Sequence, residues 1–190
     1  MRVISGSARG TKLVSIDDES TKPTMDKVKE SLYNIIVNDI DIIDSTILDL
    51  FAGSGAIGIE ALSRGAKKAV FCDNSFKDAK YLKANLEKTH FDNEKSEIII
   101  EDFKKCLEKL SKRGDKFDLI FLDPPYRKNL AGESCKLILS LDVLKKEGII
   151  IIETDDDKRD LKEIENLNLD VYDNRKYGRI KLLFMHKEGN

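Results

Sequence analysis

The sequence predicts an α/β protein in which helices cover both faces of a mostly parallel β-sheet. From Thr46 onward, short segments that are apolar throughout alternate with amphipathic segments, as buried parallel strands alternate with crossover helices. The last two strand-like segments lie too close together for a crossover helix and should pair antiparallel at one edge. The 190 residues, 41% of them apolar, suit one domain with a real core. We expect this single domain, 1–190, to comprise an N-terminal β-hairpin appendage at 1–22 and a main body at 23–190.

The N-terminal part combines a hairpin and a helix. Segments 2–6 and 11–16 predict two short strands, and Gly10 can take the positive φ that their connection needs. A helix should begin at about Pro23, because the following apolar residues recur at helical spacing. Four of them share one face: Val28, Leu32, Ile35 and Ile36.

Strands and helices are then expected in regular alternation. The predicted strands are 46–51, 68–73, 96–102, 117–123 and 148–153. The predicted helices are 55–65, 75–89, 103–114 and about 131–145. The final antiparallel pair should consist of 168–174 and 178–185, joined around Lys176 and Tyr177.

Composition narrows the class of protein. The net charge of −2, from 33 basic and 35 acidic residues, neither attracts nor excludes nucleic acid, so any polyanion site must be local. The three cysteines are widely spaced and predict reduced, packed thiols rather than a disulfide frame or a zinc site: Cys72, Cys106 and Cys135. The sequence shows neither a signal peptide nor a run of roughly 18 apolar residues, so we expect a cytoplasmic protein without a membrane partner.

A glycine-rich turn marks a candidate cofactor site. Gly53, Gly55 and Gly58 have G-x-G-x-x-G spacing between a predicted strand and a predicted helix, where the backbone can approach a ligand closely. Asp73 ends the next strand, 20 residues after Gly53, where a carboxylate can accept hydrogen bonds from ribose hydroxyls. This pattern suits a nicotinamide dinucleotide and S-adenosylmethionine equally.

Two features favour S-adenosylmethionine. Asp49 lies just before the glycines, where its charge would repel a pyrophosphate but attract the ammonium of the methionine moiety. Asp102 and Phe103 follow the third strand and suit the amino group and flat face of adenine. Asp102 suits the N-cap of the following helix equally well.

The tetrapeptide "DPPY", residues 123–126, predicts an amine-binding site. The two prolines lack N–H groups and favour extended backbone, so the strand end becomes a rigid edge of acceptors. The Asp123 carboxylate and the Pro124 carbonyl can accept both protons of an exocyclic amine, and Tyr126 can stack on the attached ring. Methylation of a nucleobase amine fits this arrangement, because the acceptors also stabilise the positive charge that develops on nitrogen, and no metal is required.

Several motifs together resemble a known family. "DLFAGSGAIGIEALSRGA", "DPPY", "RVISGSARGTKL" and "TKPTMDKVKESLYNII" are similar to the RsmD family of bacterial 16S rRNA (guanine-N2) methyltransferases, and the likeness covers nearly the whole chain. The resemblance implies a Rossmann-like class I methyltransferase fold with a small N-terminal β-hairpin. It also implies S-adenosylmethionine as methyl donor and the N2 amine of a guanine in small-subunit rRNA as target.

The resemblance assigns roles to individual residues. The expected cofactor-binding residues are Asp49, Phe51, Gly53, Gly55, Asp73, Asn74, Asp102 and Phe103. The expected catalytic residues are Asp123, Pro124, Pro125 and Tyr126.

Local positive charge provides the expected RNA contacts. The candidate RNA-binding residues are Arg2, Arg9, Lys12, Lys22, Arg127 and Lys128. Lys22 stands where the family usually has Arg and lacks its planar fork. For Lys27 and Lys29, ordinary surface lysine is the favoured interpretation, and the acidic segment 153–160 should face away from RNA. The expected partner is small-subunit rRNA within an assembled or assembling subunit, bound by a monomer.

Four alternatives are weaker. A DNA adenine-N6 methyltransferase also uses Asp-Pro-Pro-Tyr but usually carries a further recognition domain. A protein glutamine-N5 methyltransferase typically has Asn at the position of Asp123. A dinucleotide-dependent oxidoreductase leaves the tetrapeptide unexplained, and a catalytically silent RNA-binding module explains neither Asp49 nor Asp123.

Overall fold

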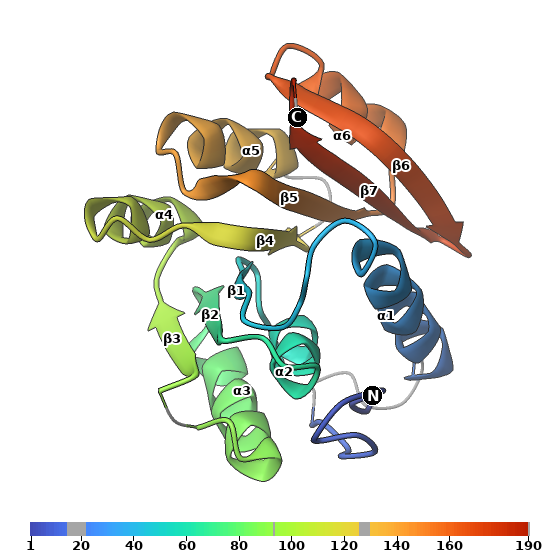
Figure 1. The fold of residues 1–190 in the computed structure, drawn as a ribbon, viewed down its shortest axis with the longest axis vertical. Helices are drawn as coiled ribbons and strands as arrows, with labels where there is room; N and C mark the ends of the chain where they lie inside the picture. Colours follow the sequence, from blue (N-terminus) through green and yellow to red (C-terminus); the bar gives the residue numbers. More distant parts are fainter. Residues whose placement is uncertain (15–21, 93, 126–129, 190) are drawn as a thin grey trace.

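The computed structural model describes residues 1–14, 22–92, 94–125 and 130–189, and for 22–25 it describes the backbone alone. Within these residues, one seven-stranded sheet has the order β3-β2-β1-β4-β5-β7-β6 (Figure 1). The strands are β1 (Thr46–Asp49), β2 (Lys68–Asp73), β3 (Ser96–Ile100), β4 (Phe117–Leu122), β5 (Leu144–Thr154), β6 (Leu169–Tyr177) and β7 (Ile180–Lys187). The helices are α1 (Lys22–Ile36), α2 (Ala56–Ser63), α3 (Phe76–Thr89), α4 (Phe103–Lys112), α5 (Leu130–Ser140) and α6 (Asp157–Ile164).

The pairing of the strands confirms the predicted sheet. β1 to β5 are parallel to one another, whereas β7 pairs antiparallel with both β5 and β6. The connection of the edge hairpin is shifted from the expected position: Tyr177 pairs with Ile180, so Lys176 and Tyr177 belong to β6 and the turn is formed by Gly178 and Arg179. Gly178 takes the positive φ of 64° that such a tight turn needs.

Two helices near the C-terminus differ from the prediction. The helix expected at about 131–145 ends at Ser140, because Asp142 has a φ of 51° and Leu144 already begins β5. Helix α6 was not predicted, since its sequence is mostly charged and gives little apolar periodicity. Its first turn is capped by Asp156, whose side chain accepts a hydrogen bond from the Arg159 N–H.

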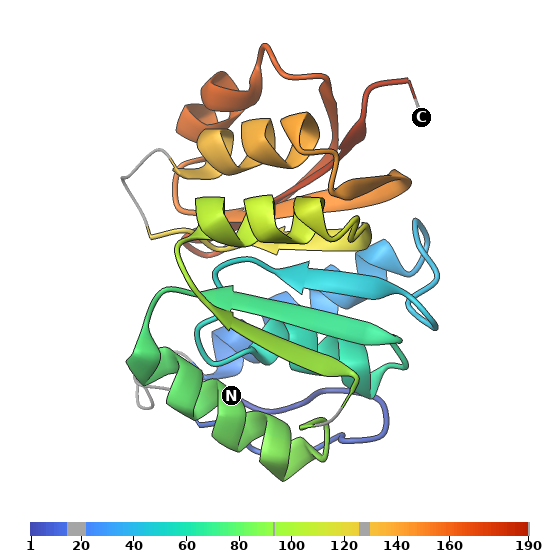
Figure 2. The same ribbon diagram turned by 90° about the vertical axis from the view of Figure 1, so that its left-hand side faces the viewer.

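The helices form a layer on each face of the sheet. α1, α2 and α3 pack with the N-terminal segment on one face, and α4, α5 and α6 pack on the other. Figure 2 shows α4 and α5 side by side on this second face. Helices on both faces explain why the central strands are apolar throughout, and they leave the carboxyl ends of the strands available for ligands.

The three cysteines lie in this core, as the sequence predicts: Cys72, Cys106 and Cys135 are buried free thiols. Across the described ranges, no helix is long and apolar enough to cross a membrane.

The expected N-terminal hairpin consists of one antiparallel bridge, between Arg2 and Lys12. It is flanked by backbone hydrogen bonds from Val3 N to Thr11 O at 3.0 Å and from Leu13 N to Met1 O at 3.0 Å. A longer ladder does not form because the next backbone N–H groups have other partners. They donate to side chains of α2, from Ile4 and Ser5 to Glu60 and from Ala8 to Ser63.

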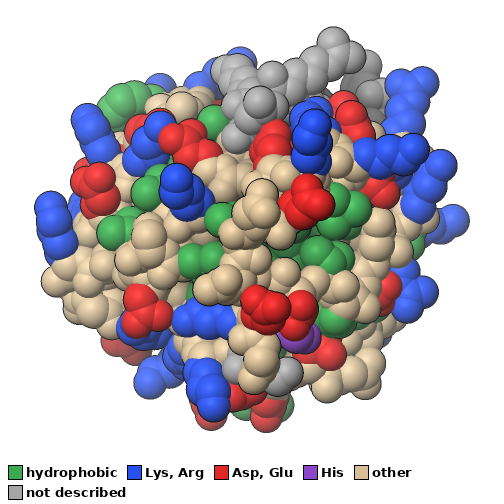
Figure 3. All heavy atoms as spheres, turned by 90° about the horizontal axis from the view of Figure 1, so that it is seen from above, with side chains coloured by type: hydrophobic (Ala, Val, Ile, Leu, Met, Phe, Trp, Pro, Cys, Tyr) green, Lys and Arg blue, Asp and Glu red, His purple; other side chains and the backbone are tan. Residues whose placement is uncertain are grey.

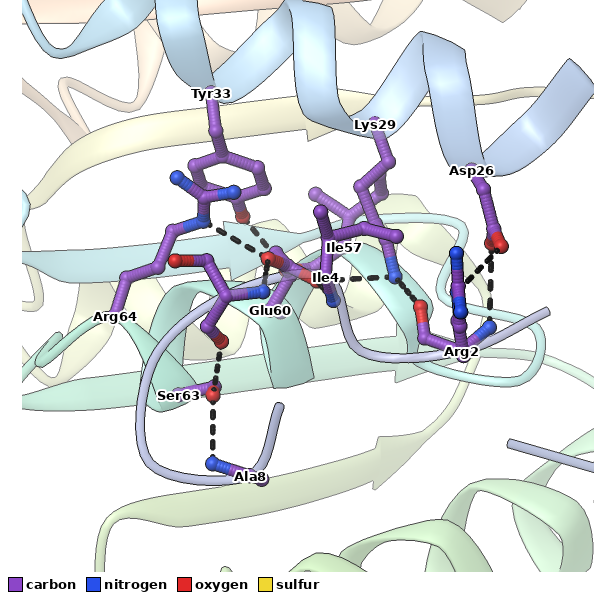
Figure 4. Close-up of polar contacts among 12 residues, drawn as sticks. Arg2, Ile4, Ala8, Asp26, Lys29, Tyr33, Ile57, Glu60, Ser63 and Arg64 are labelled. Atoms are coloured by element: carbon purple, nitrogen blue, oxygen red, sulfur yellow. Dashed lines mark hydrogen bonds and ion pairs between the residues drawn. The ribbon is translucent and has the colours of Figure 1, made fainter. Parts of the chain in front are cut away.

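A buried carboxylate connects the N-terminal segment to the helices beneath it (Figure 4). Glu60 of α2 is fully buried and accepts hydrogen bonds from Ile4 N at 2.8 Å and Ser5 N at 3.0 Å. Lys29 of α1 places its Nζ 3.1 Å from Glu60 Oε2, and Arg64 places its Nε 2.9 Å from Oε1. The carboxylate therefore has charged or N–H partners from three parts of the chain.

The interpretation of Lys29 as a surface lysine is wrong. Its residue is 2% exposed, and its Nζ also donates a hydrogen bond to the Arg2 carbonyl. Burial lowers the pKa of Lys29, an effect that the Glu60 carboxylate opposes. The sequence around Lys29 did not indicate that this side chain is buried, because its partner, Glu60, lies on another helix.

Replacing Glu60 should destabilise the protein strongly. In Glu60→Ala the Lys29 ammonium would remain buried without its partner, so we expect the free energy of unfolding to fall by about 3–5 kcal/mol. Urea denaturation measures this change. The control is Glu147→Ala, whose side chain is 76% exposed and paired with Lys146 at 3.9 Å, and which should change stability by less than about 1 kcal/mol. Equal effects of the two substitutions would contradict the importance of the buried pair.

Candidate active site

Acidic residues gather where the strand order reverses. The sheet runs outward from β1 in one direction and from β4 in the other, which opens a ligand-binding crevice at their carboxyl ends. Asp49 ends β1, Asp73 ends β2, and Asp123 directly follows β4. Glu153 occupies the equivalent region of β5, the neighbour of β4. Four adjacent strands thus bring a carboxyl group to the same edge of the sheet.

The glycine turn packs onto these carboxyl groups. Gly53 and Gly55 have φ values of 51° and 76°, which other residues rarely adopt. The Gly53 N–H donates to Asp73 Oδ2 at 2.8 Å, and the Gly58 N–H donates to Asp49 Oδ2 at 3.2 Å. A Cβ on Gly58 would lie 2.3 Å from the Phe71 ring, so glycine there permits α2 to pack closely on β2. The spacing of the glycines therefore reflects both loop conformation and helix packing.

A cavity of about 630 Å³ brings most of the expected cofactor residues together. Its lining includes Phe51, Asp73, Asn74, Asp102, Phe103, Asp123, Pro124 and Pro125. The rings of Phe51 and Phe103 lie with their centroids 5.5 Å apart and form an apolar wall. An aromatic wall with carboxylates around it suits a nucleoside, whose base is flat and whose ribose and amino groups donate hydrogen bonds.

Two of these carboxylates already have backbone partners. Asp73 accepts from Ser75 N at 2.8 Å through Oδ1, in addition to the bond from Gly53. Asp102 is the N-cap of α4 and accepts from Lys104 N at 3.0 Å through Oδ1. Asp102 can therefore cap α4 and still accept a hydrogen bond from a ligand in the cavity, since a carboxylate oxygen has more than one lone pair.

A smaller cavity of about 140 Å³ adjoins the first. Phe51 and Asp123 line both cavities, so the amine-site aspartate stands at their boundary. Further acidic walls of the smaller cavity are Asp49 and Glu153, and Gly53 forms part of it. The N-terminal segment and α1 also contribute to the lining, through Met1, Val28 and Lys29.

Burial makes these three carboxyl groups difficult to ionise. The pKa of Asp49 is raised to about 7, mainly by burial; the hydrogen bond from the Gly58 N–H opposes this shift, and the nearby Asp123 and Asp73 add to it. Burial likewise raises the pKa of Asp123 to about 7. The pKa of Glu153 is raised to about 8 by burial and then by Asp123. A cation or a set of N–H donors entering this cavity would favour the ionised forms.

Glu153 was not recognised as a site residue from the sequence. It begins the acidic stretch expected to face away from RNA, but the structure places it in the smaller cavity beside Asp123. The signal was available, because Glu153 is an acid at the carboxyl end of an apolar strand, as are Asp49 and Asp73.

The face that carries α6 and the β6–β7 hairpin shows acidic and basic side chains interspersed (Figure 3).

Some expected residues lie outside these two cavities, and others lie outside the described residues. Arg2, Arg9 and Lys12 are exposed on the N-terminal segment, and Arg2 pairs with Asp26, with its Nε 3.3 Å from Oδ2. Tyr126, Arg127 and Lys128 lie outside the described part of the chain. For Lys22 the structure describes the backbone but not the side chain. No group of three or more His, Cys, Asp or Glu among the described residues is arranged to hold a metal ion.

The fold and the cavities define the class of protein. A parallel sheet that ends in an antiparallel β7, a glycine turn after β1 and acids at the ends of β1 and β2 are the features of class I S-adenosylmethionine-dependent methyltransferases. Within this class, the chain belongs to the family described as "Conserved hypothetical protein 95", whose model matches residues 1–186.

Curated relatives support the resemblance to the RsmD family. The Bacillus subtilis protein YlbH is 43% identical over 155 residues, which cover 82% of this chain and 83% of the relative. The Haemophilus influenzae protein named "Ribosomal RNA small subunit methyltransferase D" is 40% identical over 158 residues, covering 83% of this chain and 80% of that one. The predicted family is therefore confirmed.

Solved structures agree with this assignment. The Escherichia coli protein yhhF superposes with a TM-score of 0.79 at 26% identity, covering 100% of this chain and 99% of that one. A more distant protein, SMU.776 in complex with SAH (S-adenosylhomocysteine), has a TM-score of 0.68 at 19% identity and matches 85% of this chain and 49% of its own. At 19% identity, the similarity to SMU.776 supports the fold alone.

Cofactor binding should depend on pH through Asp49. Its raised pKa means that a proton must leave the carboxyl group before it can pair with the cofactor's ammonium. As the pH falls below about 7, the affinity for S-adenosylhomocysteine should therefore fall, by up to about tenfold per pH unit. Titration calorimetry between about pH 6 and about pH 7.5 measures this dependence. Asp49→Asn should bind more weakly and have a smaller slope, whereas the exposed control Asp170→Asn should behave like the wild type. An unchanged slope in Asp49→Asn would contradict this role.

Proposed function

We propose that the protein transfers the methyl group of S-adenosylmethionine to the exocyclic N2 amine of a guanine in small-subunit rRNA. The observation that carries this proposal is the position of Asp123 at the boundary of the two cavities, with Pro124 beside it in the wall of the larger one. The larger cavity suits the cofactor's nucleoside, and the smaller one presents Asp49 to the cofactor's ammonium and Asp123 to the target amine. The relatives named ribosomal RNA small subunit methyltransferase D support rRNA as the substrate.

The cofactor fits the residues that line the cavities. Asp49 is buried without a cationic partner among the described residues, so an ammonium beside it would relieve the cost of its ionisation. Phe51 and Phe103 provide apolar contact for adenine, and Asp73 and Asn74 line the region suited to the ribose. Gly53 lets the backbone approach the methionine moiety. When bound, S-adenosylmethionine supplies an electrophilic methyl group on a sulfonium.

The amine site would orient the nucleophile and accept its proton. The Asp123 carboxylate and the Pro124 carbonyl accept hydrogen bonds from the two amine protons, which directs the nitrogen lone pair toward the cofactor. Tyr126, outside the described residues, would stack on the base. After methyl transfer the nitrogen carries an extra proton, and the Asp123 carboxylate, whose pKa is near 7, is suited to accept it.

The N-terminal segment would contribute to RNA binding. Arg2, Arg9 and Lys12 are exposed there, on a segment that the Glu60 carboxylate holds against α1 and α2. Three further cations, whose side chains are not described, are proposed to contact RNA as well: Lys22, Arg127 and Lys128. In this proposal the chain is one methyltransferase domain with residues 1–22 as its RNA-contacting part, and it acts as a cytoplasmic monomer on an assembled or assembling subunit.

The first experiment identifies the product. Labelled S-adenosylmethionine is incubated with small ribosomal subunits from a strain that lacks the enzyme, and the labelled nucleoside is identified after digestion. The proposal predicts N2-methylguanosine. N6-methyladenosine, or the absence of label in RNA, would refute it.

Removing the Asp123 carboxylate should abolish most turnover. We expect Asp123→Ala to lose about 10²- to 10⁴-fold in methyl transfer, because it lacks both an amine acceptor and the proton acceptor. Its affinity for S-adenosylhomocysteine should stay close to that of the wild type. The matched control is Asp118→Asn, at the opposite end of β4, where the side chain accepts from Thr46 N and Lys145 instead of lining a cavity. Wild-type turnover in Asp123→Ala would show that the acceptor edge is not catalytic.

Removing a cation from the N-terminal segment should weaken RNA binding alone. Arg9→Gln should raise the KM for ribosomal subunits and reduce the salt dependence of binding, because one phosphate contact is lost. The affinity for S-adenosylhomocysteine should not change. Arg179→Gln, in the exposed turn of the edge hairpin, is the control and should leave both quantities unchanged. If the two variants have the same effect on KM, the N-terminal segment does not contact RNA.

A further inference from the structure

Glu153 stands beside the amine-site aspartate in the sheet. Leu122 of β4 is in register with Ile152 of β5, and the strands are parallel. The next residues of the two strands, Asp123 and Glu153, are therefore neighbours whose side chains project from the same face. Both line the smaller cavity. Two carboxyl groups from adjacent strands thus face the space in which the proposed function puts the target amine.

Within the described residues, Glu153 has no partner that compensates its burial. The residue is 4% exposed, and no hydrogen bond or ion pair of its side chain is formed there. The nearest charged wall residues do not help: Asp49 and Asp123 are acids, and the Lys29 ammonium is already paired with Glu60. The raised pKa of Glu153 follows from this environment. A buried acceptor of this kind is costly unless a ligand brings a donor to it.

Guanine has a second donor next to its N2 amine. Its Watson–Crick edge presents N1–H and N2–H₂ side by side, so two adjacent carboxyl groups can each accept a hydrogen bond. Adenine presents its N6–H₂ donor next to N1, which is an acceptor. One carboxylate recognises an amine of either base, whereas two adjacent carboxylates distinguish them, because the N1 lone pair of adenine would face a carboxylate oxygen.

We propose that Glu153 is a specificity-determining residue that accepts a hydrogen bond from N1–H of the target guanine, while Asp123 accepts from the N2 amine. This inference rests on the proposed function and explains why the site selects guanine among bases with an exocyclic amine. Glu153 acts on the choice of base, and Asp123 acts on the reacting nitrogen. A merely structural role for Glu153 would affect all substrates equally.

The test separates the two donors of the base. Once the methylated nucleotide is mapped, small subunits are reconstituted with rRNA that carries either guanine or 2-aminopurine at that position. 2-Aminopurine keeps the reacting amine but has an acceptor at N1. The wild type should methylate guanine about 10- to 100-fold faster at limiting substrate, because 2-aminopurine leaves Glu153 without its donor. Glu153→Gln should reduce this ratio to within a few fold, since an amide can donate to N1 as well as accept from it.

Controls exclude effects on folding and on the other base atoms. The absence of O6 from 2-aminopurine affects the wild type and the variant alike, so the comparison between them isolates N1. Glu163→Gln changes another partly buried acid, which accepts from Gly132 N on the opposite face of the sheet, and it should leave the ratio at its wild-type value. S-adenosylhomocysteine affinity and thermal unfolding verify that Glu153→Gln is folded.

The outcomes distinguish this inference from the proposed function. A guanine to 2-aminopurine ratio in Glu153→Gln equal to that of the wild type would overturn the role of Glu153 and leave guanine-N2 methylation intact. A wild type that does not form N2-methylguanosine in guanine-containing subunits would overturn both. A reduced ratio in the variant, with the control unchanged, is the result that supports the inference.

Discussion

The buried carboxylate of Glu60 is the interaction on which the N-terminal half of the structure depends. It pairs with Lys29 and Arg64 and accepts two backbone N–H groups of the N-terminal segment, so it links α1, α2 and residues near Met1. Leaving any of these groups unpaired in the interior would be costly, which makes the arrangement all-or-none. Because Met1, Val28 and Lys29 also line the smaller cavity, the same carboxylate indirectly shapes one wall of the candidate active site.

The electrostatics of the candidate active site differ from those of the Glu60 cluster. Glu60 is buried with its partners in place, whereas the buried Asp49 and Glu153 and the half-buried Asp123 line one cavity with few donors. Their raised pKa values show that the free protein bears a cost for holding acids together in a poorly solvated cavity. A cationic cofactor and a base rich in N–H donors would relieve that cost.

Most of the fold could be predicted because it depends on local patterns. Apolar strands alternate with amphipathic helices, and the short connection before β7 enforces an antiparallel edge. The glycine turn and the acids Asp49, Asp73 and Asp123 could also be located, since parallel strands bring their carboxyl ends to one edge. The errors fell where local signals are weak: α6 is mostly charged, and the positive φ of Asp142 that ends α5 leaves no trace in hydrophobic periodicity.

The sequence by itself determined the class of fold, the glycine turn after β1 and the acids at the strand ends, because residue type and spacing along one strand or turn suffice for each. Only the tertiary structure decided which charges become partners. Lys29 reads as a surface lysine until Glu60 is seen opposite it. Glu153 lies at the end of an apolar strand, as Asp49 does, but only the pairing of β5 with β4 shows that it lies beside Asp123. The reason is physical: burial and pairing arise between elements distant in the chain, and no pattern within either element encodes the other.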